Sequence, residues 1–169
     1  VINSLGSTIW VNKPQFKFFD CYFNGFTEKQ HTTNIEEDRT TYVRCEFTDD
    51  PAVNPNYKHT GYLINSWGSN PLLIDCTISM YKSGWIADRT YSGTAAPFTM
   101  KGGKFNVYTH NGNAAMSGKY EDVIINDLRE DTTQYLLLDT EGFQAKNLSV
   151  RTKDGSATAL AFYGRNSST

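Results

Sequence analysis

The sequence has little charge of either sign, few cysteines and no long apolar run, and each shortage argues against a class of protein. Charged residues make up 20% of the 169 residues and the formal net charge is −2, so the basic patch of a typical nucleic-acid-binding protein is not expected. No apolar run reaches the 18 residues that a membrane-spanning helix needs. The three cysteines form no CxxC motif and no Cys/His cluster, which argues against a zinc site. We therefore expect no nucleic-acid partner, no membrane insertion, no metal and no cofactor.

Runs rich in Leu, Ala, Glu and Lys, which are typical of helices, are also missing. Aromatic residues instead make up 14% of the chain, with ten Tyr and ten Phe, and Thr, Asn, Ser and Gly are common. This composition is typical of β-structure. The first residue is Val, so we expect the sequence to be a mature or excised fragment.

Each cysteine lies at the centre of a short strand-like run. The runs are FDCYF at 19–23, VRCEF at 43–47 and IDCTI at 74–78. In a strand, alternate side chains point to opposite faces. The pattern therefore predicts that each cysteine and the apolar residues two positions away point inward, with the cysteine acting as a small buried hydrophobe.

The cysteines also begin a repeat. Comparable positions follow further along the chain, and successive marks lie 21 to 31 residues apart. A second strand-like run follows the later marks, at 61–65, 84–88, 113–117, 135–139 and 159–163. The six marks are Cys21, Cys45, Cys76, Gly103, Asn126 and Asn147.

A period of a little over 20 residues is typical of one coil of a parallel β-helix, in which equivalent positions stack as ladders along the axis. We predict an all-β, right-handed, single-stranded parallel β-helix of about six to seven coils over residues 16–169, with residues 1–15 as a cap or lead-in segment. The alternative is a β-sandwich with short strands. Residues 48–60 and 88–97 are expected to be loops that leave the coils, and such insertions often carry function.

The segments IDCTISMYKSGWIAD, MKGGKFNV and AKNLSV resemble the repeats of the pectate-lyase-like β-helix superfamily, and within it those of bacteriophage tailspike and tail-fibre proteins. The resemblance implies a homotrimeric spike on the virion tail, outside the cell, that binds a bacterial surface polysaccharide. It also implies possible endo-glycosidase activity. The alternatives are a single-chain polysaccharide hydrolase or lyase, and a structural shaft or adhesin segment without activity.

Glycoside hydrolysis needs two carboxylates, about 5–5.5 Å apart for retention or roughly 6.5–9.5 Å apart for inversion. Asp20, Glu46 and Asp75 share one parity beside the cysteines, which predicts an outward acidic strip. Arg44 lies two residues from Glu46 and is expected to face outward as well. The competing interpretation is a solvated strand face with coil-to-coil ion pairs.

Asp49 and Asp50, at the start of the 48–60 loop, are the second candidate catalytic pair, with His59 as a possible proton carrier. These two aspartates are the only fragment of the N-T-D, D-D, G-H-G and R-I-K set of polygalacturonase-like relatives. A DDP sequence is also a common way to begin a turn.

Sugar rings stack on flat aromatic faces, so exposed aromatic residues in the loops are candidate glycan-binding residues. The alternative is that they pack against a neighbouring subunit, because aromatic residues are enriched in interfaces. The candidates are Trp67, Trp85, Tyr57 and Tyr91, with His59 beside them.

Overall fold

The computed structural model describes part of the chain in full and further short strands by their backbone alone. The strands known from their backbone are 2–3, 8–9, 27–28, 62–65, 85–87, 115–116, 136–139 and 160–163. The fully described residues are 16–24, 40–53, 55, 71–81, 99–108, 118–130 and 144–153.

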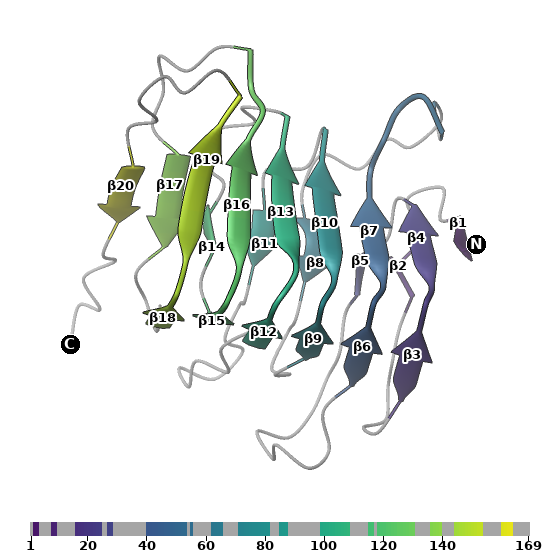
Figure 1. The fold of residues 1–169 in the computed structure, drawn as a ribbon. Helices are drawn as coiled ribbons and strands as arrows, with labels where there is room; N and C mark the ends of the chain where they lie inside the picture. The colour runs from purple at the N-terminus through teal and green to yellow at the C-terminus, as the bar shows by residue number, and fades with distance from the viewer. Residues whose placement is uncertain are drawn as a thin grey trace, which may run out of the picture.

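Within these residues the chain is all-β, without a helix, and every strand pairing is parallel. Two large sheets dominate (Figure 1). The seven-stranded sheet has the order β1 (Ile2–Asn3), β4 (Tyr22–Asn24), β7 (Glu46–Thr48), β10 (Thr77–Met80), β13 (Lys104–Val107), β16 (Ile124–Asp127) and β19 (Ser149–Thr152). The six-stranded sheet has the order β3 (Lys17–Phe19), β6 (Thr41–Val43), β9 (Leu72–Ile74), β12 (Thr99–Lys101), β15 (Lys119–Glu121) and β18 (Gln144–Lys146).

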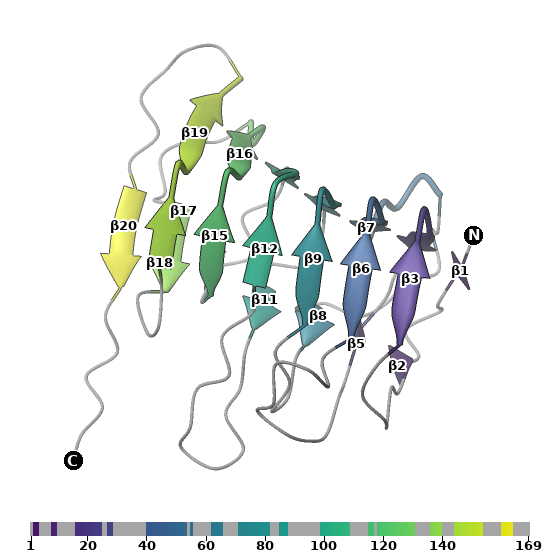
Figure 2. The same cartoon turned by 60° about the horizontal axis from the view of Figure 1, so that its bottom comes forward.

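A third row of strands accompanies the two large sheets (Figure 2). It consists of the pair β2 (Thr8–Ile9) and β5 (Thr27–Glu28), the trio β8 (Tyr62–Asn65), β11 (Trp85–Ala87) and β14 (Ala115–Met116), and the pair β17 (Leu136–Asp139) and β20 (Leu160–Tyr163). From β3 onward, the chain visits the six-stranded sheet, the seven-stranded sheet and the third row in that order, repeatedly.

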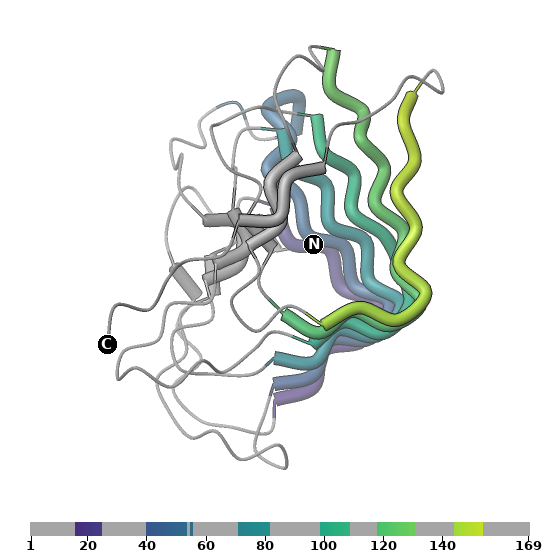
Figure 3. Tube along the Cα trace, turned by 90° about the vertical axis from the view of Figure 1, so that its left-hand side faces the viewer, coloured from purple at the N-terminus to yellow at the C-terminus, as the bar shows by residue number. Residues whose placement is uncertain are grey.

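This order is consistent with a β-helix solenoid, and Figure 3 shows equivalent segments stacked behind one another along one axis. A β-sandwich is built from antiparallel sheets, so the parallel pairings do not support that alternative. The predicted lead-in segment contributes β1 and β2, which pair with β4 and β5. The five predicted second runs each contain a strand of the third row.

The core lies between the sheets and is built from columns of apolar side chains in register. One column runs along the seven-stranded sheet as Phe23, Phe47, Ile78, Phe105 and Ile125, all buried. The rings of Phe23 and Phe47 stack with centroids 4.9 Å apart and planes 9° from parallel. Strands in a sheet lie roughly 4.8 Å apart, so aromatic residues at equivalent positions of successive strands meet face to face.

A sharp bend joins each strand of the six-stranded sheet to the next strand of the seven-stranded sheet. The bend residue has a positive φ, between 51° and 68°, in six successive repeats. Asp, Asn and Gly tolerate this left-handed conformation better than other residues, and only the second repeat departs from that preference. The six bend residues are Asp20, Arg44, Asp75, Gly102, Asp122 and Asn147.

The bend corrects the prediction that the cysteines lie within continuous strands. Each cysteine follows the bend residue, so the strand parity changes just before it. Cys45 and Cys76 are buried as predicted, and Cys21 is half-buried. The apolar residue two positions after each cysteine also points inward, as predicted. The apolar residue two positions before the cysteine does not, and Phe19, for example, is 54% exposed.

The ladder that the cysteines begin continues through Gly103, as predicted, but the two asparagine marks were wrong. Backbone N–H groups donate in succession from Glu46 to Cys21, from Thr77 to Cys45, from Lys104 to Cys76, from Ile124 to Gly103 and from Ser149 to Val123. Val123 therefore occupies the fifth position, and Leu148, next to Ser149, the sixth. Asn126 lies on the opposite face of β16, and Asn147 is a bend residue.

Candidate functional site

Asp49, one of the predicted catalytic carboxylates, is buried at the point where the chain leaves the seven-stranded sheet. Its Oδ1 accepts the backbone N–H of Tyr81 at 2.6 Å. In later repeats the equivalent N–H groups, of Tyr108 and Leu128, donate to backbone carbonyls of the preceding strand. The carboxylate of Asp49 thus replaces the backbone carbonyl that accepts this hydrogen bond in later repeats. The bond continues the hydrogen bonding of the sheet beside the loop that begins here.

Asp50, the other half of the predicted pair, lies on the opposite side of the chain and is half-buried. Its Oδ1 accepts the N–H of Ala52 at 2.8 Å, and its own N–H donates to Oγ1 of Thr48 at 3.2 Å. These bonds form the turn that a DDP sequence favours. Asp49 and Asp50 are therefore separated by the strand and do not face each other.

The predicted acidic strip is divided between two positions of the repeat. Asp20 and Asp75 are bend residues two repeats apart, with Arg44 at the bend between them. Arg44 donates to both carboxylate oxygens of Asp20, each at 2.7 Å, and this hydrogen bonding lowers the pKa of Asp20. Glu46 instead lies in register with Tyr22 and Thr77 on the seven-stranded sheet, and the partner of Arg44 is Asp20.

The structure brings Glu46 and Asp50 together with three tyrosines on the outer face of the seven-stranded sheet. Alternate residues of its strands point away from the core, and two of them, together with three residues that follow the strand ends, form what we call the tyrosine–acid surface. Tyr81 and Tyr108 directly follow the successive strands β10 and β13, and their rings stack with centroids 4.2 Å apart and planes 7° from parallel. Glu46 and Tyr108 are exposed, and the other three are half-buried. The tyrosine–acid surface consists of Tyr22, Glu46, Asp50, Tyr81 and Tyr108.

The pKa values of two of these tyrosines, Tyr22 and Tyr81, are raised above that of a free phenol. Burial raises the pKa of Tyr81 to about 12, helped by a hydrogen bond with Tyr108 and by the negative charge of Asp50. The pKa of Tyr22 is also raised, first by burial and then by the charges of Glu46 and Asp50. These phenols therefore remain neutral hydrogen-bonding groups beside two carboxylates, an arrangement suited to hydroxyl-rich ligands.

A ladder of polar side chains runs through the middle of the same face. The Nδ2 of Asn106 donates to Oγ of Ser79 at 3.1 Å, and the Nδ2 of Asn126 donates to Oδ1 of Asn106 at 2.9 Å. Asn106 and Asn126 occupy one register position on neighbouring strands, so this bond joins equivalent residues of two successive repeats. The bonds link three strands beside the tyrosine pair and fix the outer face on which the pair lies.

Most of the predicted glycan-binding residues lie outside the described residues, namely Trp67, Tyr57, Tyr91 and His59. Trp85 begins β11, between β8 and β14, and only its backbone is described. The aromatic pair of the tyrosine–acid surface was missed, although its signal is present in the sequence. Tyr81 and Tyr108 each lie five residues after a ladder position, Cys76 and Gly103, so the repeat itself places them side by side.

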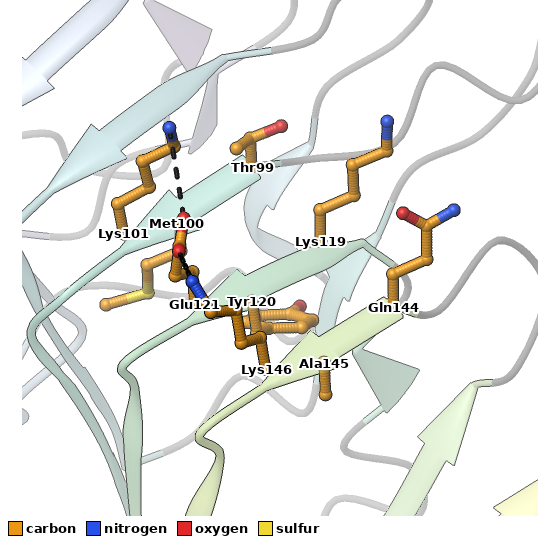
Figure 4. A pocket seen from close by; sticks show the side chains of 9 residues that line it. All are labelled: Thr99, Met100, Lys101, Lys119, Tyr120, Glu121, Gln144, Ala145 and Lys146. Carbon is orange, nitrogen blue, oxygen red and sulfur yellow. Dashed lines mark hydrogen bonds and ion pairs between the residues drawn. The ribbon is translucent and has the colours of Figure 1, made fainter.

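The outer face of the six-stranded sheet carries a groove that was not predicted (Figure 4). Its volume is about 330 Å³, and it crosses β12, β15 and β18. The Nζ of Lys146 and that of Lys101 lie 2.5 Å and 3.9 Å from carboxylate oxygens of Glu121. Figure 4 shows Lys101 and Lys119 extending from the same side of the sheet. We call this feature the lysine groove, lined on its outer side by Thr99, Lys101, Lys119, Glu121, Gln144 and Lys146.

The described part of the chain contains no cluster of three or more His, Cys, Asp or Glu side chains that could hold a metal ion. Within the same residues, no helix is long and apolar enough to cross a membrane.

Comparison of the chain with protein-family models, with curated proteins and with solved structures finds no match.

Proposed function

We propose that this chain is a segment of a bacteriophage tailspike-type protein that recognises a bacterial surface polysaccharide through the tyrosine–acid surface. The observation that carries the proposal is the parallel pair of Tyr81 and Tyr108 beside Asp50 on an outward sheet face. Aromatic faces cover the apolar C–H patches of sugars, and neighbouring carboxylates and phenols accept or donate hydrogen bonds to sugar hydroxyls.

The proposed fold is a right-handed, single-chain parallel β-helix of about six to seven coils, assembled as a homotrimer on the virion tail. Connections between parallel strands of one sheet are right-handed in nearly all proteins, which supports the proposed hand. The fixed order of the three rows of strands supports the coil as the repeating unit.

Recognition fits the carboxylates better than cleavage does. Asp49 is buried and bonded to backbone, and Asp20 is paired with Arg44. Glu46 and Asp50 are four residues apart in extended chain, so their Cα atoms are separated by about 13 Å. Hydrolytic sites hold their two carboxyl groups roughly 5 to 9.5 Å apart, whereas the carboxylate of Asp50 is engaged with the following turn, where it accepts the N–H of Ala52.

The test is binding of purified capsular polysaccharides and lipopolysaccharides from a panel of bacteria. For a polysaccharide that binds, Tyr81→Ala and Tyr108→Ala are each expected to weaken binding about tenfold, because half of the aromatic platform is lost. Phe19→Ala is the matched control, since it removes an exposed aromatic ring from the six-stranded sheet. Equal losses in all three variants, or none in the tyrosine variants, would overturn the assignment.

The same mixtures separate recognition from depolymerisation. A binding segment leaves the polysaccharide at its original length, whereas a depolymerase produces new reducing ends. If new ends appear, Glu46→Gln and Asp50→Asn are the variants to assay next, and a loss of turnover with binding retained would favour the enzymatic alternative.

A further inference from the structure

The lysine groove concentrates positive charge on a chain whose net charge is negative. Of the residues that the structure describes, three with ammonium groups and one with a carboxylate line it, and the whole chain has a formal net charge of −2. Glu121 is shared by Lys101 and Lys146 through the two ion pairs. Within the described residues, the ammonium of Lys119 takes part in no ion pair. The groove therefore has more positive charge than its own carboxylate can balance.

The spacing of these groups follows the solenoid. Lys101, Glu121 and Lys146 occupy one register position on three successive strands, and Thr99, Lys119 and Gln144 occupy another. Successive strands are roughly 4.8 Å apart, a distance comparable to the length of one sugar ring. A polysaccharide that lies across the strands would therefore meet a cationic or hydrogen-bonding group on each strand.

We propose that the lysine groove binds the anionic groups of an acidic polysaccharide, such as the carboxylates of uronic acids or the sulfates of a sulfated glycan. Lysines supply compact positive charges for these groups, and the exposed side chain of Gln144 supplies hydrogen bonds for hydroxyls. The proposal shares only its ligand class with the function proposed above, because it concerns a different face of the molecule.

Nucleic acid fits the groove less well. Proteins that bind single-stranded nucleic acid combine positive charge with outward aromatic rings on which the bases stack. Among the described residues, the only aromatic one that lines this groove is Tyr120, which is buried and lies on the opposite side of the sheet from the lysine side chains (Figure 4).

Calorimetric titration with oligogalacturonate, a heparin fragment, a neutral dextran fragment and a single-stranded DNA oligonucleotide tests the proposal. We expect the unaltered chain to bind at least one of the two acidic saccharides, with affinity falling as salt is added, and dextran to bind more weakly. The acidic saccharide that binds identifies the anionic group, carboxylate or sulfate.

Two changes in opposite directions identify the groove. Replacing Lys101, Lys119 and Lys146 by Gln is expected to weaken binding about tenfold. Glu121→Gln is expected to strengthen it severalfold, because it removes the carboxylate that competes for the ammonium groups. The matched control replaces three exposed lysines elsewhere, Lys17, Lys104 and Lys153, by Gln and should change affinity less than about twofold.

Three outcomes would overturn the proposal. They are binding of neither acidic saccharide, equal weakening by the groove variant and its control, and tighter binding of DNA that depends on the groove lysines. A lysine variant that fails to fold leaves Glu121→Gln to decide, since no change or a loss of affinity in that variant contradicts the proposal. The lysine variants and Glu121→Gln test the groove, whereas Tyr81→Ala and Tyr108→Ala test the tyrosine–acid surface, so failure of one site and failure of the other are separate results.

Discussion

The outer faces of the two large sheets come from the same repeat yet carry opposite chemistry. On the seven-stranded sheet, Asp50 lies near the stacked Tyr81 and Tyr108, and Glu46 lies beside Tyr22. On the six-stranded sheet, three lysines surround Glu121 in a groove. Both sets occupy outward positions of strands whose inward positions hold apolar residues such as Phe47 and Met100. The comparison teaches that the inward columns hold the two sheets together, while the outward columns can change their chemistry from one face to the other.

The largest expected effect comes from a change that disturbs both faces at once. Gly103 has a φ of +84°, and an added Cβ would lie 2.1 Å from the carbonyl oxygen of Cys76. Gly103→Ala must therefore strain the backbone at the corner that joins the sheets, and we expect a loss of at least about 2 kcal/mol in the free energy of unfolding. Urea denaturation measures it.

The neighbouring glycine provides the control for that change. At Gly102 an added Cβ would meet the Oδ1 of Asp75, a side-chain atom that can move, and Asn147 already occupies the equivalent bend with a φ of 53°. Gly102→Asn should therefore lower the free energy of unfolding clearly less than Gly103→Ala does. The opposite order would mean that the corner does not depend on the close approach to Cys76.

An intermediate effect is expected from a change that disturbs the seven-stranded sheet alone. Asp49→Ala leaves the backbone N–H of Tyr81 without its acceptor, which costs about 1–3 kcal/mol for a buried group. Asp49→Asn retains a carbonyl acceptor and should cost less. Thermal unfolding compares the stability of the two variants. Both should bind the acidic saccharide at the lysine groove as the unaltered chain does. If Asn and Ala are equally destabilising, the hydrogen bond is not the source of the effect.

The smallest effect is the ionisation of a single phenol. Because the pKa of Tyr81 is raised from 10.0 to about 12, its contribution to stability is present below pH 10 and is lost as the pH rises toward 12. Absorbance at the tyrosinate band should show a late-titrating phenol that Tyr81→Phe removes. Asp50→Asn should make Tyr81 ionise at lower pH, since the charge of Asp50 contributes to the shift. An unchanged titration in Tyr81→Phe would assign the late phenol to another tyrosine.

The sequence predicted the repeat well because the inward ladder uses small and apolar residues that recur with the coil. The burial of Cys45 and Cys76, the place of Gly103 and the strands of the third row were all predicted correctly. The bend was not predicted, because one left-handed residue reverses the strand parity while the pattern of apolar residues on both sides still looks like a continuous strand. The Asp, Asn or Gly before most ladder positions was the available signal, and Arg44 obscured it.

The candidate sites were harder to predict, for two physical reasons. Two adjacent aspartates look alike in sequence, but strand alternation buries Asp49 and leaves Asp50 on the outer side. Lys101, Glu121 and Lys146 become neighbours only when three strands are aligned in register, and the incorrect marks at Asn126 and Asn147 prevented that alignment. With Val123 and Leu148 in the ladder, the positions of Glu121 and Lys146 in the lysine groove follow from position counting, whereas the tyrosine pair already follows from Cys76 and Gly103.

The strand–bend–strand unit behaves like a reading frame. Six units are equal in length and aligned residue for residue, namely 17–24, 41–48, 72–79, 99–106, 119–126 and 144–151. The segments that connect them differ in length, and the shortest is 107–118 and the longest 49–71. One residue inserted beside a bend would exchange inward and outward side chains in the strand that follows. The same insertion in a connecting segment leaves the frame intact. Variation in length can therefore accumulate between the units, while the units themselves tolerate only substitution.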